Sequence, residues 1–400
     1  MKVKQADRLI GVPMSKTRII FAECARLAGE GVDVTALTLG EPDFDTPEFI
    51  KESCKKALDE GHTKYTDNIG ILPLRIAICD KLKRENGLDY DLKEIIATTG
   101  VAQGMFAAML SFLNPGDEVL IPDPVYLTYS AIPKIAGAKV KRYKLLEENN
   151  FNIDVKQIES LISEKTRMIA IVSPNNPTGS VLKRADVEAL ADIAKKHDLL
   201  VLSDEIYERL TYSEENPHIS IASLPGMKER TILLNGLSKS MAMTGWRLGY
   251  IAADEKLIDP LNRMCFYMTA GATSFVQEAA VTALSHDEGS VEKMRSEFKK
   301  RRDFLFSYID STKNFSCVMP EGAFYVFMNI KRTGMSSDEF CEYALEKHQL
   351  AFIPGDAFGE CGQGYVRISY AASMDKLRQA MDKLAKIDRE ISEDRISVRK

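Results

Sequence analysis

The stretch TILLNGLSKSMAMTGWRLGY, residues 231–250, decides how the rest of this chain is interpreted. It opens with an apolar run over residues 231–234, which predicts a buried strand. Ser238 and Lys239 follow soon after that run, and Arg247 lies eight residues beyond the lysine. An isolated lysine at a strand end is usually a solvated surface residue. Other segments must therefore decide between a surface lysine and a reactive one.

The amine, the hydroxyl and the guanidinium of this stretch suit one kind of cofactor. A lysine amine forms an imine with an aldehyde. Serine hydroxyls and arginine side chains bind phosphate. The stretch therefore indicates a cofactor that is both an aldehyde and a phosphate ester, namely pyridoxal 5'-phosphate.

The composition is that of an ordinary globular protein. Of the 400 residues, 45% are hydrophobic and 28% are charged. The formal net charge of −5 favours neither nucleic acid nor an anionic membrane as a partner. No segment approaches the roughly 18 apolar residues of a membrane-spanning helix, and the first eight residues lack the apolar core of a signal peptide. We expect no nucleic-acid partner and no membrane.

Cysteine and histidine usage gives no sign of disulfides or of a metal. The seven cysteines are dispersed without a C-x-x-C pair, and the five histidines are isolated from one another. Dispersed, odd-numbered cysteines are typical of reduced thiols in a cytosol. We therefore expect a cytoplasmic protein and no metal site.

The middle of the chain alternates apolar runs with helical patterns. Helices are predicted over residues 102–112 and 184–197. Strands are predicted over residues 94–99, 117–121, 167–173, 199–203 and 231–234. Apolar runs without polar alternation predict a mostly parallel sheet with helices on both faces, so the fold class is α/β.

The sequence after residue 274 has a different character. A long helix is predicted to about residue 309, and a final amphipathic helix over 374–391. Short strands are expected at 323–328, 351–353 and 365–369, with a helix at 337–347. We therefore predict a large domain over residues 48–285. A smaller α+β domain is expected to combine residues 1–47 with residues 286–400.

Polar residues follow the predicted strands, where α/β sheets bind their ligands. Asp204 ends one strand, and a buried carboxylate there needs a cation such as a protonated pyridine nitrogen. A helix N-cap is the alternative role. Asn176 lies in a rigid SPNNPTG turn that could present its amide to a ring oxygen, or could be a turn and no more.

Three further residues have both a functional and a structural interpretation. Gly100 joins a strand to a helix whose N-terminal amides could bind phosphate, although many such turns do not. Tyr126 could stack on a flat ring or pack in the core. Arg367 lies inside an apolar strand, where it could grip a substrate carboxylate or form a structural salt bridge.

Taken in order, these motifs resemble the class-I pyridoxal-phosphate-dependent aminotransferases, the aspartate aminotransferase family. The resemblance runs from LGEPDFDTP at residues 39–47 to Arg367. It implies a pyridoxal-phosphate transferase fold, a large cofactor domain, a small domain that closes on substrate, and a homodimer with shared active sites.

The resemblance also implies a role for each motif residue. Lys239 resembles the lysine that binds the cofactor and moves the proton, and Asp204 the partner of the pyridine nitrogen. The remaining roles are a contact to the ring oxygen by Tyr207 and Asn176, phosphate binding by Val101, Ala102, Ser238 and Arg247, ring stacking by Tyr126, a contact to the neighbouring subunit's phosphate by Tyr65, and substrate binding by Gly40, Asn176 and Arg367.

Two departures from the family pattern affect specificity. Gly236 stands where some relatives carry a phosphate-binding hydroxyl. Ala102 stands where some aspartate-specific relatives carry a lysine that reads the side-chain carboxylate. The donor could therefore be aspartate, or aromatic or broad.

The expected activity is transfer of an amino group from an L-amino acid to a 2-oxo acid, with 2-oxoglutarate as the expected acceptor. One alternative is a carbon–sulfur β-lyase on the same scaffold. Another is a non-enzymatic regulator that retains the cofactor.

Overall fold

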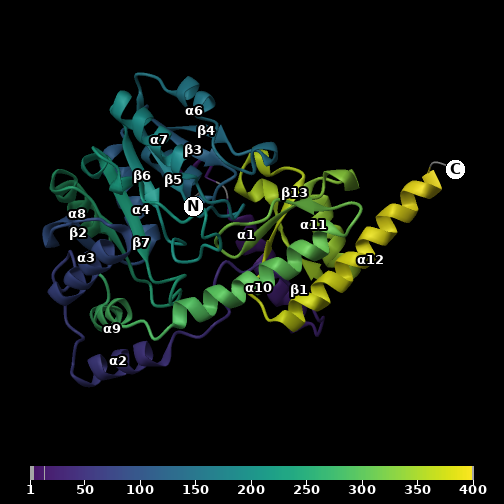
Figure 1. The fold of residues 1–400 in the computed structure, drawn as a ribbon, viewed down its shortest axis with the longest axis horizontal. Helices are drawn as coiled ribbons and strands as arrows, with labels where there is room; N and C mark the ends of the chain where they lie inside the picture. Colours follow the sequence, from purple (N-terminus) through teal and green to yellow (C-terminus); the bar gives the residue numbers. More distant parts are fainter. Residues whose placement is uncertain (1–3, 13, 399–400) are drawn as a thin grey trace.

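The computed structural model describes residues 4–12 and 14–398, with side chains up to residue 393. Its largest element is a seven-stranded sheet (Figure 1). The strand order is β2 (Ile95–Thr98), β8 (Gly249–Ala252), β7 (Thr231–Gly236), β6 (Leu200–Asp204), β5 (Thr166–Val172), β3 (Glu118–Asp123) and β4 (Lys139–Lys144). Only β8 runs antiparallel to its neighbours, so the predicted mostly parallel sheet is confirmed.

Helices cover both faces of this sheet, which explains why its inner strands are largely apolar, whereas the edge strand β4 carries four basic residues. Along β5, Met168 and Ala170 face one layer of the core, whereas Ile169 and Ile171 face the other. The first layer contains α4 (Val101–Phe112), α5 (Thr128–Ala136) and α8 (Glu255–Thr269). The second contains α3 (Leu72–Asn86), α6 (Val155–Leu161), α7 (Arg184–Lys196) and α9 (Ser274–Ser285), with α2 (Glu48–Asp59) packed on α9.

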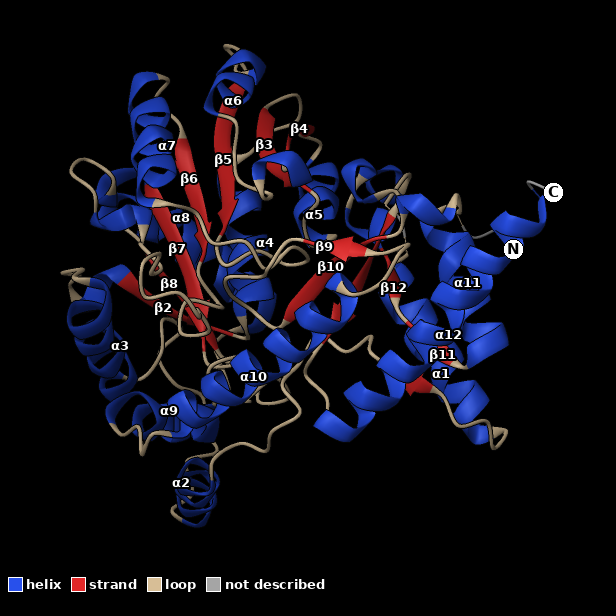
Figure 2. Cartoon of the chain, turned by 45° about the vertical axis from the view of Figure 1, so that its right-hand side comes forward, coloured by secondary structure: helices blue, strands red, loops and turns tan. Residues whose placement is uncertain are grey.

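A smaller lobe is built on an antiparallel sheet (Figure 2). Its strand order is β12 (Ile353–Pro354), β13 (Tyr365–Ser369), β10 (Tyr325–Asn329) and β9 (Ser316–Cys317). Near it, β1 (Thr35–Ala36) pairs in parallel with β11 (Leu350–Ala351), which ties the N-terminal stretch to this lobe. The helices of the lobe are α1 (Lys16–Gly29), α10 (Ser290–Asp310), α11 (Ser337–His348) and α12 (Met374–Val398).

Short 3-10 helices lie in the connections between these elements. They span Asp7–Leu9, Leu92–Glu94, Glu147–Asn149, Ile221–Ser223, Lys228–Arg230, Lys331–Thr333, Gly355–Phe358 and Glu360–Gly362.

The prediction of one long helix from residue 274 to 309 is wrong. The chain forms α9 and α10, which are separated at residues 286–289. Gly289 has φ +78°, a left-handed conformation that glycine adopts without strain. The Asp287 carboxylate accepts from the Ser290 backbone N–H at 3.0 Å, and so satisfies an amide at the start of α10. A glycine and a side-chain acceptor together end one helix and begin the next.

The expected strand at residues 351–353 is also divided. Ala351 ends β11, whereas Ile353 begins β12, and the two strands belong to different sheets. Such short strands are placed by their tertiary partners, because two or three residues carry no periodic pattern of their own.

The division into residues 48–285 and residues 1–47 plus 286–400 remains a proposal. It is supported by the origin of the sheets: the seven-stranded sheet uses residues 95–252 alone, and both smaller sheets use only residues outside that range. Helix α10 leads from one lobe into the other (Figure 1). The packing between the lobes is tight, since Tyr207 and Leu210 share a core cluster with Phe324.

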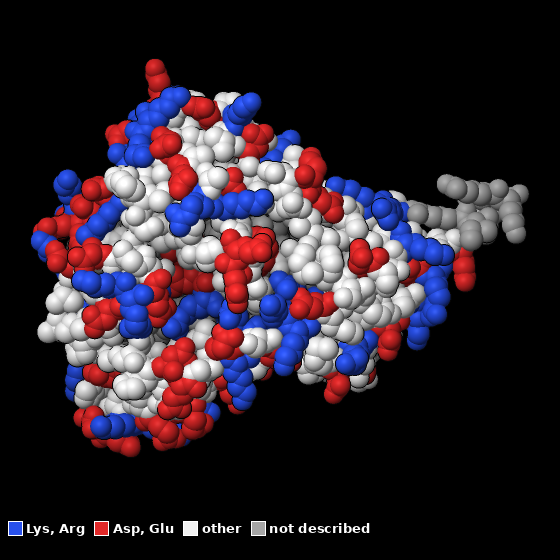
Figure 3. Space-filling view, viewed as in Figure 1, with Lys and Arg blue, Asp and Glu red and all other residues white. Residues whose placement is uncertain are grey.

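Two surface properties bear on partners. Within the described ranges, no helix has both the length and the apolar character needed to cross a bilayer. On the face shown in Figure 3, acidic and basic side chains are interspersed. That face presents no continuous basic surface of the kind that binds nucleic acid.

Candidate active site

The carboxyl ends of β2, β3, β5, β6 and β7 meet at one edge of the large sheet, and a cavity of about 400 Å³ opens there. Residues of the N-terminal segment and of the small lobe close its other sides. The cavity brings together the predicted residues Gly40, Val101, Ala102, Tyr126, Asn176, Asp204, Tyr207, Ser238, Lys239, Arg247 and Arg367. Tyr65 is the predicted site residue that does not line it.

Lys239 lies just beyond β7 with its amine inside the cavity. Its Nζ donates to the Gly40 carbonyl at 2.5 Å. Burial lowers the pKa of Lys239 to about 8, and Arg367 and Arg247 lower it as well, whereas the nearby Glu41 opposes the shift. A share of the amine is therefore neutral near pH 7, as nucleophilic or basic chemistry requires.

The structure explains why residue 236 carries no hydroxyl. A Cβ at Gly236 would lie 2.9 Å from the Gly249 Cα and 2.9 Å from the Leu248 carbonyl oxygen. Contacts that short are prohibitive between backbone atoms, so β7 and β8 approach here only because both residues are glycine. Ser238, which is buried at the cavity wall, is the hydroxyl that remains.

Asp204 ends β6 and is almost completely buried. Its Oδ2 accepts from the Tyr129 hydroxyl at 2.5 Å, and its Oδ1 accepts from the Ile206 N–H at 3.1 Å. Burial raises its pKa to about 6, although both hydrogen bonds lower it. The helix N-cap interpretation is wrong, because the chain turns after Asp204 without forming a helix. The carboxylate instead faces the cavity, where it can meet a cation.

A cradle for an anion lies at the N-terminus of α4. Gly100 caps this helix with φ +76°, and a Cβ there would lie 2.5 Å from an Arg247 guanidinium nitrogen. The guanidinium is thus packed directly against the helix start, and it also donates to the Thr244 carbonyl at 2.9 Å. The first amides of a helix have no intrahelical acceptor, so they and the helix dipole attract negative charge.

Arg367 is the buried cation of the site, with 2% of its surface exposed. Its Nη1 donates to Asn176 Oδ1 at 3.1 Å and its Nη2 to the Thr38 carbonyl at 2.8 Å. The aromatic ring of Tyr325 lies 4.5 Å from the guanidinium. The Nε of Arg367 has no hydrogen-bond partner among the described residues. No carboxylate among the described side chains pairs with it, so the structural salt bridge is not formed. A buried guanidinium in this state can bind an external carboxylate.

Three residues of the site were missed by sequence reasoning. Tyr129 holds Asp204, and the Tyr325 hydroxyl lies 2.9 Å from that of Tyr207. Arg18, at the start of α1, also lines the cavity. Tyr325 could have been found by strand alternation, since it shares a face with Phe327, the residue opposite Arg367. Tyr129 and Arg18 belong to helices that carry no recognisable motif.

Tyr65 lies outside the cavity and is 95% exposed. Its segment is fixed in place, because the neighbouring Asn68 side chain donates to Asn262 on α8. The expected contact of Tyr65 with a phosphate therefore stays a prediction that needs a second subunit.

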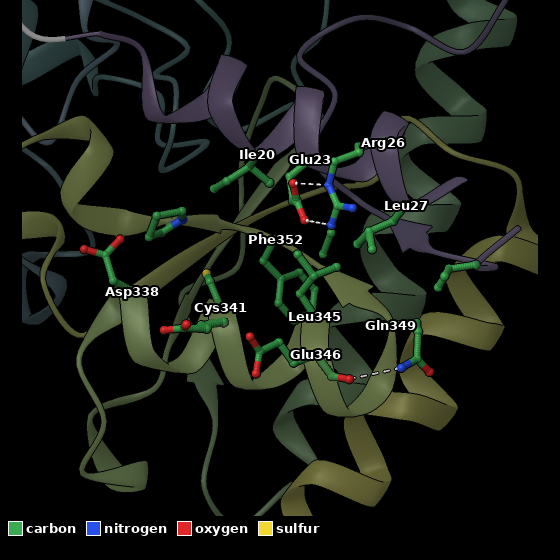
Figure 4. A pocket seen from close by; sticks show the side chains of 14 residues that line it. Ile20, Glu23, Arg26, Leu27, Asp338, Cys341, Leu345, Glu346, Gln349 and Phe352 are labelled. Carbon is green, nitrogen blue, oxygen red and sulfur yellow. Dashed lines mark hydrogen bonds and ion pairs between the residues drawn. The ribbon is translucent and has the colours of Figure 1, made fainter. Parts of the chain in front are cut away.

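A second cavity, of about 640 Å³, lies between α1 and α11 (Figure 4). The cation in its lining, Arg26, is already paired with Glu23 at 2.6 Å and Glu30 at 2.5 Å. Since that lining contains no lysine or histidine, this cavity offers no amine for aldehyde chemistry.

Glu205, Glu208 and His218 form a cluster next to Asp204, with potential ligand atoms within 4.8 Å of one another. Lys81 pairs with Glu208, and His218 Nε2 lies 3.1 Å from Glu205. Each carboxylate thus has a basic partner within the protein.

Comparison with known proteins places this geometry in context. The sequence family "Aminotransferase class I and II" matches residues 32–384. The chain is 44% identical to an aromatic-amino-acid aminotransferase of Thermococcus litoralis, over 96% of this chain and 98% of that one. It is 45% identical, with the same coverage, to an aspartate aminotransferase of Pyrococcus abyssi.

A solved structure is similarly close. The aspartate aminotransferase of Thermus thermophilus with maleate superimposes with a TM-score of 0.92 at 36% identity, covering 96% of this chain and all of that one. Such agreement extends over both lobes.

Proposed function

The chain belongs to the class I and II aminotransferases, and from this premise we propose that it moves an amino group from aspartate or an aromatic amino acid to a 2-oxo acid, with pyridoxal 5'-phosphate as cofactor. Some of the relatives are named aspartate aminotransferases and another is named an aromatic-amino-acid aminotransferase. The proposal includes both donor classes for that reason. The expected acceptor is 2-oxoglutarate.

The residues of the cavity suit the proposed cofactor at three points. Lys239 offers a partly neutral amine for the aldehyde. The start of α4, Ser238 and Arg247 form a cradle for the phosphate, and a Cβ on Gly100 would displace the Arg247 guanidinium from its present position. Asp204 offers a buried carboxylate for the pyridine nitrogen. Tyr126 and Tyr207 also line the cavity, where they could contact the ring.

When bound, pyridoxal phosphate supplies an aldehyde that takes up the donor's amine and a ring that withdraws electrons from the α-carbon. Arg367 holds the donor's α-carboxylate, and so fixes which bond at the α-carbon faces Lys239. The Lys239 amine accepts the α-proton, as its lowered pKa permits. Because Asn176 Oδ1 is occupied by Arg367, its Nδ2 is the atom left to donate to a ring oxygen.

The observation that carries this proposal is a buried arginine that has no acidic partner among the described side chains and shares its cavity with a lysine of lowered pKa. Every amino acid and 2-oxo acid has the carboxylate that this arginine lacks.

The test uses the purified protein with cofactor bound and single amino acids without an acceptor. We expect aspartate or tyrosine to convert the cofactor stoichiometrically to its amine form, seen as loss of the visible absorption band, and 2-oxoglutarate to restore it. Continuous release of pyruvate, ammonia and thiocysteine from cystine, without an acceptor, would instead establish the β-lyase. Cofactor binding with no conversion by any amino acid would leave the regulator.

We also propose that the protein is a homodimer. Tyr65 is 95% exposed, and Tyr267 and Phe266 on α8 are 81% and 51% exposed. The hydrogen bond from Asn68 to Asn262 joins their two segments, so these exposed aromatic side chains belong to adjoining parts of the chain. Exposed large apolar side chains that lie close together are typical of protein–protein interfaces. A partner there would bring Tyr65 toward the second active site.

A cytoplasmic location remains part of the proposal. It is supported by the seven cysteines, none of which forms a disulfide.

A further inference from the structure

Four cations among the described residues line the active-site cavity: Arg18, Lys239, Arg247 and Arg367. Three of them have an internal contact and a place in the proposed chemistry. Lys239 donates to Gly40, Arg247 to Thr244, and Arg367 to Asn176 and Thr38. The Arg18 guanidinium forms no hydrogen bond or ion pair with any side chain that the structure describes, so it is the cation left to bind something else.

The backbone at Arg18 is held firmly, although its side chain is exposed. Lys16 pairs with Asp338 and with Asp356, both at 2.7 Å, and thereby anchors the first turn of α1 to the small lobe. The Ser15 hydroxyl accepts from the Arg18 N–H at 3.4 Å and caps the helix. The anchor lies two residues from Arg18, whereas the rest of α1 spans the cavity shown in Figure 4. Arg18 is therefore fixed at the mouth of the site with a free guanidinium.

The rest of the cavity lining indicates which part of a substrate the Arg18 guanidinium would contact. A donor with its carboxylate on Arg367 and its amine at Lys239 must direct its side chain at the rest of the lining. That lining includes Leu39, Ala102 and Met105. These apolar side chains accept an aromatic ring, and the hydroxyls of Ser15, Thr17 and Thr128 in the same lining carry no charge to balance a second carboxylate. Within this chain, Arg18 is the cation available for one.

We propose that Arg18 binds the side-chain carboxylate of acidic donors and acceptors in this active site. Aromatic substrates use the apolar wall instead, and the guanidinium then stays in solvent. One exposed cation beside an apolar wall accounts for a site that takes both classes. This inference rests on the proposed aminotransferase function and names the residue that sets its substrate class.

The size of the effect follows from the kind of bond. A guanidinium–carboxylate hydrogen bond, partly exposed to water, is expected to change the reaction of acidic substrates by about 10- to 100-fold. Lysine at this position keeps the charge but loses the planar fork, so it should restore only part of the effect. Substrates without a second carboxylate should be affected less than about threefold.

The experiment compares single-turnover half-reactions of the cofactor-loaded protein with donors alone. The acceptor 2-oxoglutarate is left out because it carries a second carboxylate, which Arg18 would also bind. Wild type, Arg18→Ala and Arg18→Lys are each mixed with aspartate, tyrosine or alanine, and the rate constant over the apparent Kd is measured. Arg26→Ala is the matched control, because Arg26 lies on the same helix but is paired with Glu23 and Glu30 outside the active site. Binding of succinate, followed by the shift of the cofactor spectrum, gives a second measurement without catalysis.

We expect Arg18→Ala to lose at least tenfold in the rate constant divided by the apparent Kd for aspartate, and at least tenfold in affinity for succinate. Its values for tyrosine and alanine should stay close to those of wild type. Arg26→Ala should match wild type with every ligand. An unchanged ratio of aspartate to tyrosine in Arg18→Ala, or an equal loss with all three donors, would overturn the assignment while leaving the aminotransferase intact. Wild-type protein that converts none of the donors would overturn the proposed function itself, and this inference with it.

Discussion

At the scale of single residues, the site depends on burial that perturbs two ionisable groups in opposite ways. Lys239 is pushed toward its neutral form and Asp204 toward its protonated form. Both shifts come first from the removal of water, and a partner of opposite charge opposes each of them. A cofactor with a cationic ring nitrogen and an anionic phosphate would supply such partners.

Replacement of Lys239 tests the centre of this arrangement. Lys239→Ala removes the amine that binds the aldehyde and accepts the α-proton. We expect turnover to fall by several orders of magnitude and the visible absorption band of the bound cofactor to be lost, with the melting temperature little changed. Near-normal transamination in this variant would contradict the entire assignment of the site.

Replacement of Tyr129 tests whether its hydroxyl lowers the pKa of Asp204. The Tyr129 hydroxyl lowers the pKa of Asp204, so Tyr129→Phe should raise it above about 6. The acidic limb of the activity profile should move to higher pH, and kcat at pH 7 should fall by roughly tenfold, as for loss of a hydrogen bond to a charged group. Tyr143→Phe is the control, because that buried hydroxyl donates to the Ala170 carbonyl instead. Similar pH profiles in the two variants would rule out a specific role for Tyr129.

His218 gives the protein a pH-dependent stability term. Burial alone would lower its pKa, but Glu205 outweighs this and the pKa is raised. The resulting stabilisation is fully present below the pKa of about 6.5 of an unfolded histidine and is lost as the pH rises through the folded-state value. The melting temperature of wild type should therefore fall relative to that of His218→Gln as the pH is raised above 6.5. The exposed His286→Gln should follow wild type, and parallel curves for all three would show that the His218–Glu205 pair is not a source of stability.

At the scale of elements, the cradle at the start of α4 depends on a glycine. Gly100 has φ +76°, and any Cβ there collides with the Arg247 guanidinium. Gly100→Ala should weaken binding of the cofactor by at least tenfold, because it displaces Arg247 from the helix start and strains the backbone.

Gly104, the other glycine at α4, is not a suitable control. It packs closely on Leu234 and Ile251, so an added methyl group would disturb the core. Gly116→Ala is better, because it has a positive φ, open space around its Cβ and no contact with the site. Both variants carry backbone strain, but only Gly100→Ala should lose cofactor in equilibrium dialysis. Equal retention would show that the cradle does not bind the phosphate.

At the scale of the whole molecule, the site is assembled from both lobes and, as we propose, from two subunits. We expect the protein to sediment as a dimer at assay concentration. Tyr267→Glu places a charge in the exposed aromatic surface and should shift the equilibrium toward monomer, with a parallel loss of activity. Phe21→Glu, also an exposed aromatic position but on α1 of the small lobe, is the control. A fully active monomer would contradict the composite site.

The sequence by itself determined the sheet and its ligand edge. Apolar runs that alternate with helical patterns predict buried strands covered by helices on both faces, and helical crossovers between neighbouring strands favour a mostly parallel sheet. Gly100, Asn176, Asp204 and Lys239 could be grouped from their positions in the sequence, since the carboxyl ends of parallel strands share one edge. Arg367 could be singled out because a guanidinium in an apolar strand is costly without an anion.

The tertiary structure alone decided the rest. Lobe packing brings Tyr325 to Tyr207, and α5 brings Tyr129 to Asp204, across distances in sequence that no local pattern records. The break between α9 and α10 depends on a glycine and an aspartate within a strongly helical segment. Arg18 belongs to a helix that shows its relation to the site only once Lys16 has anchored it to the small lobe. The physical reason is the same in each case: periodicity reports which face of an element is buried, but the partner on the other side of that face is fixed only when the elements pack.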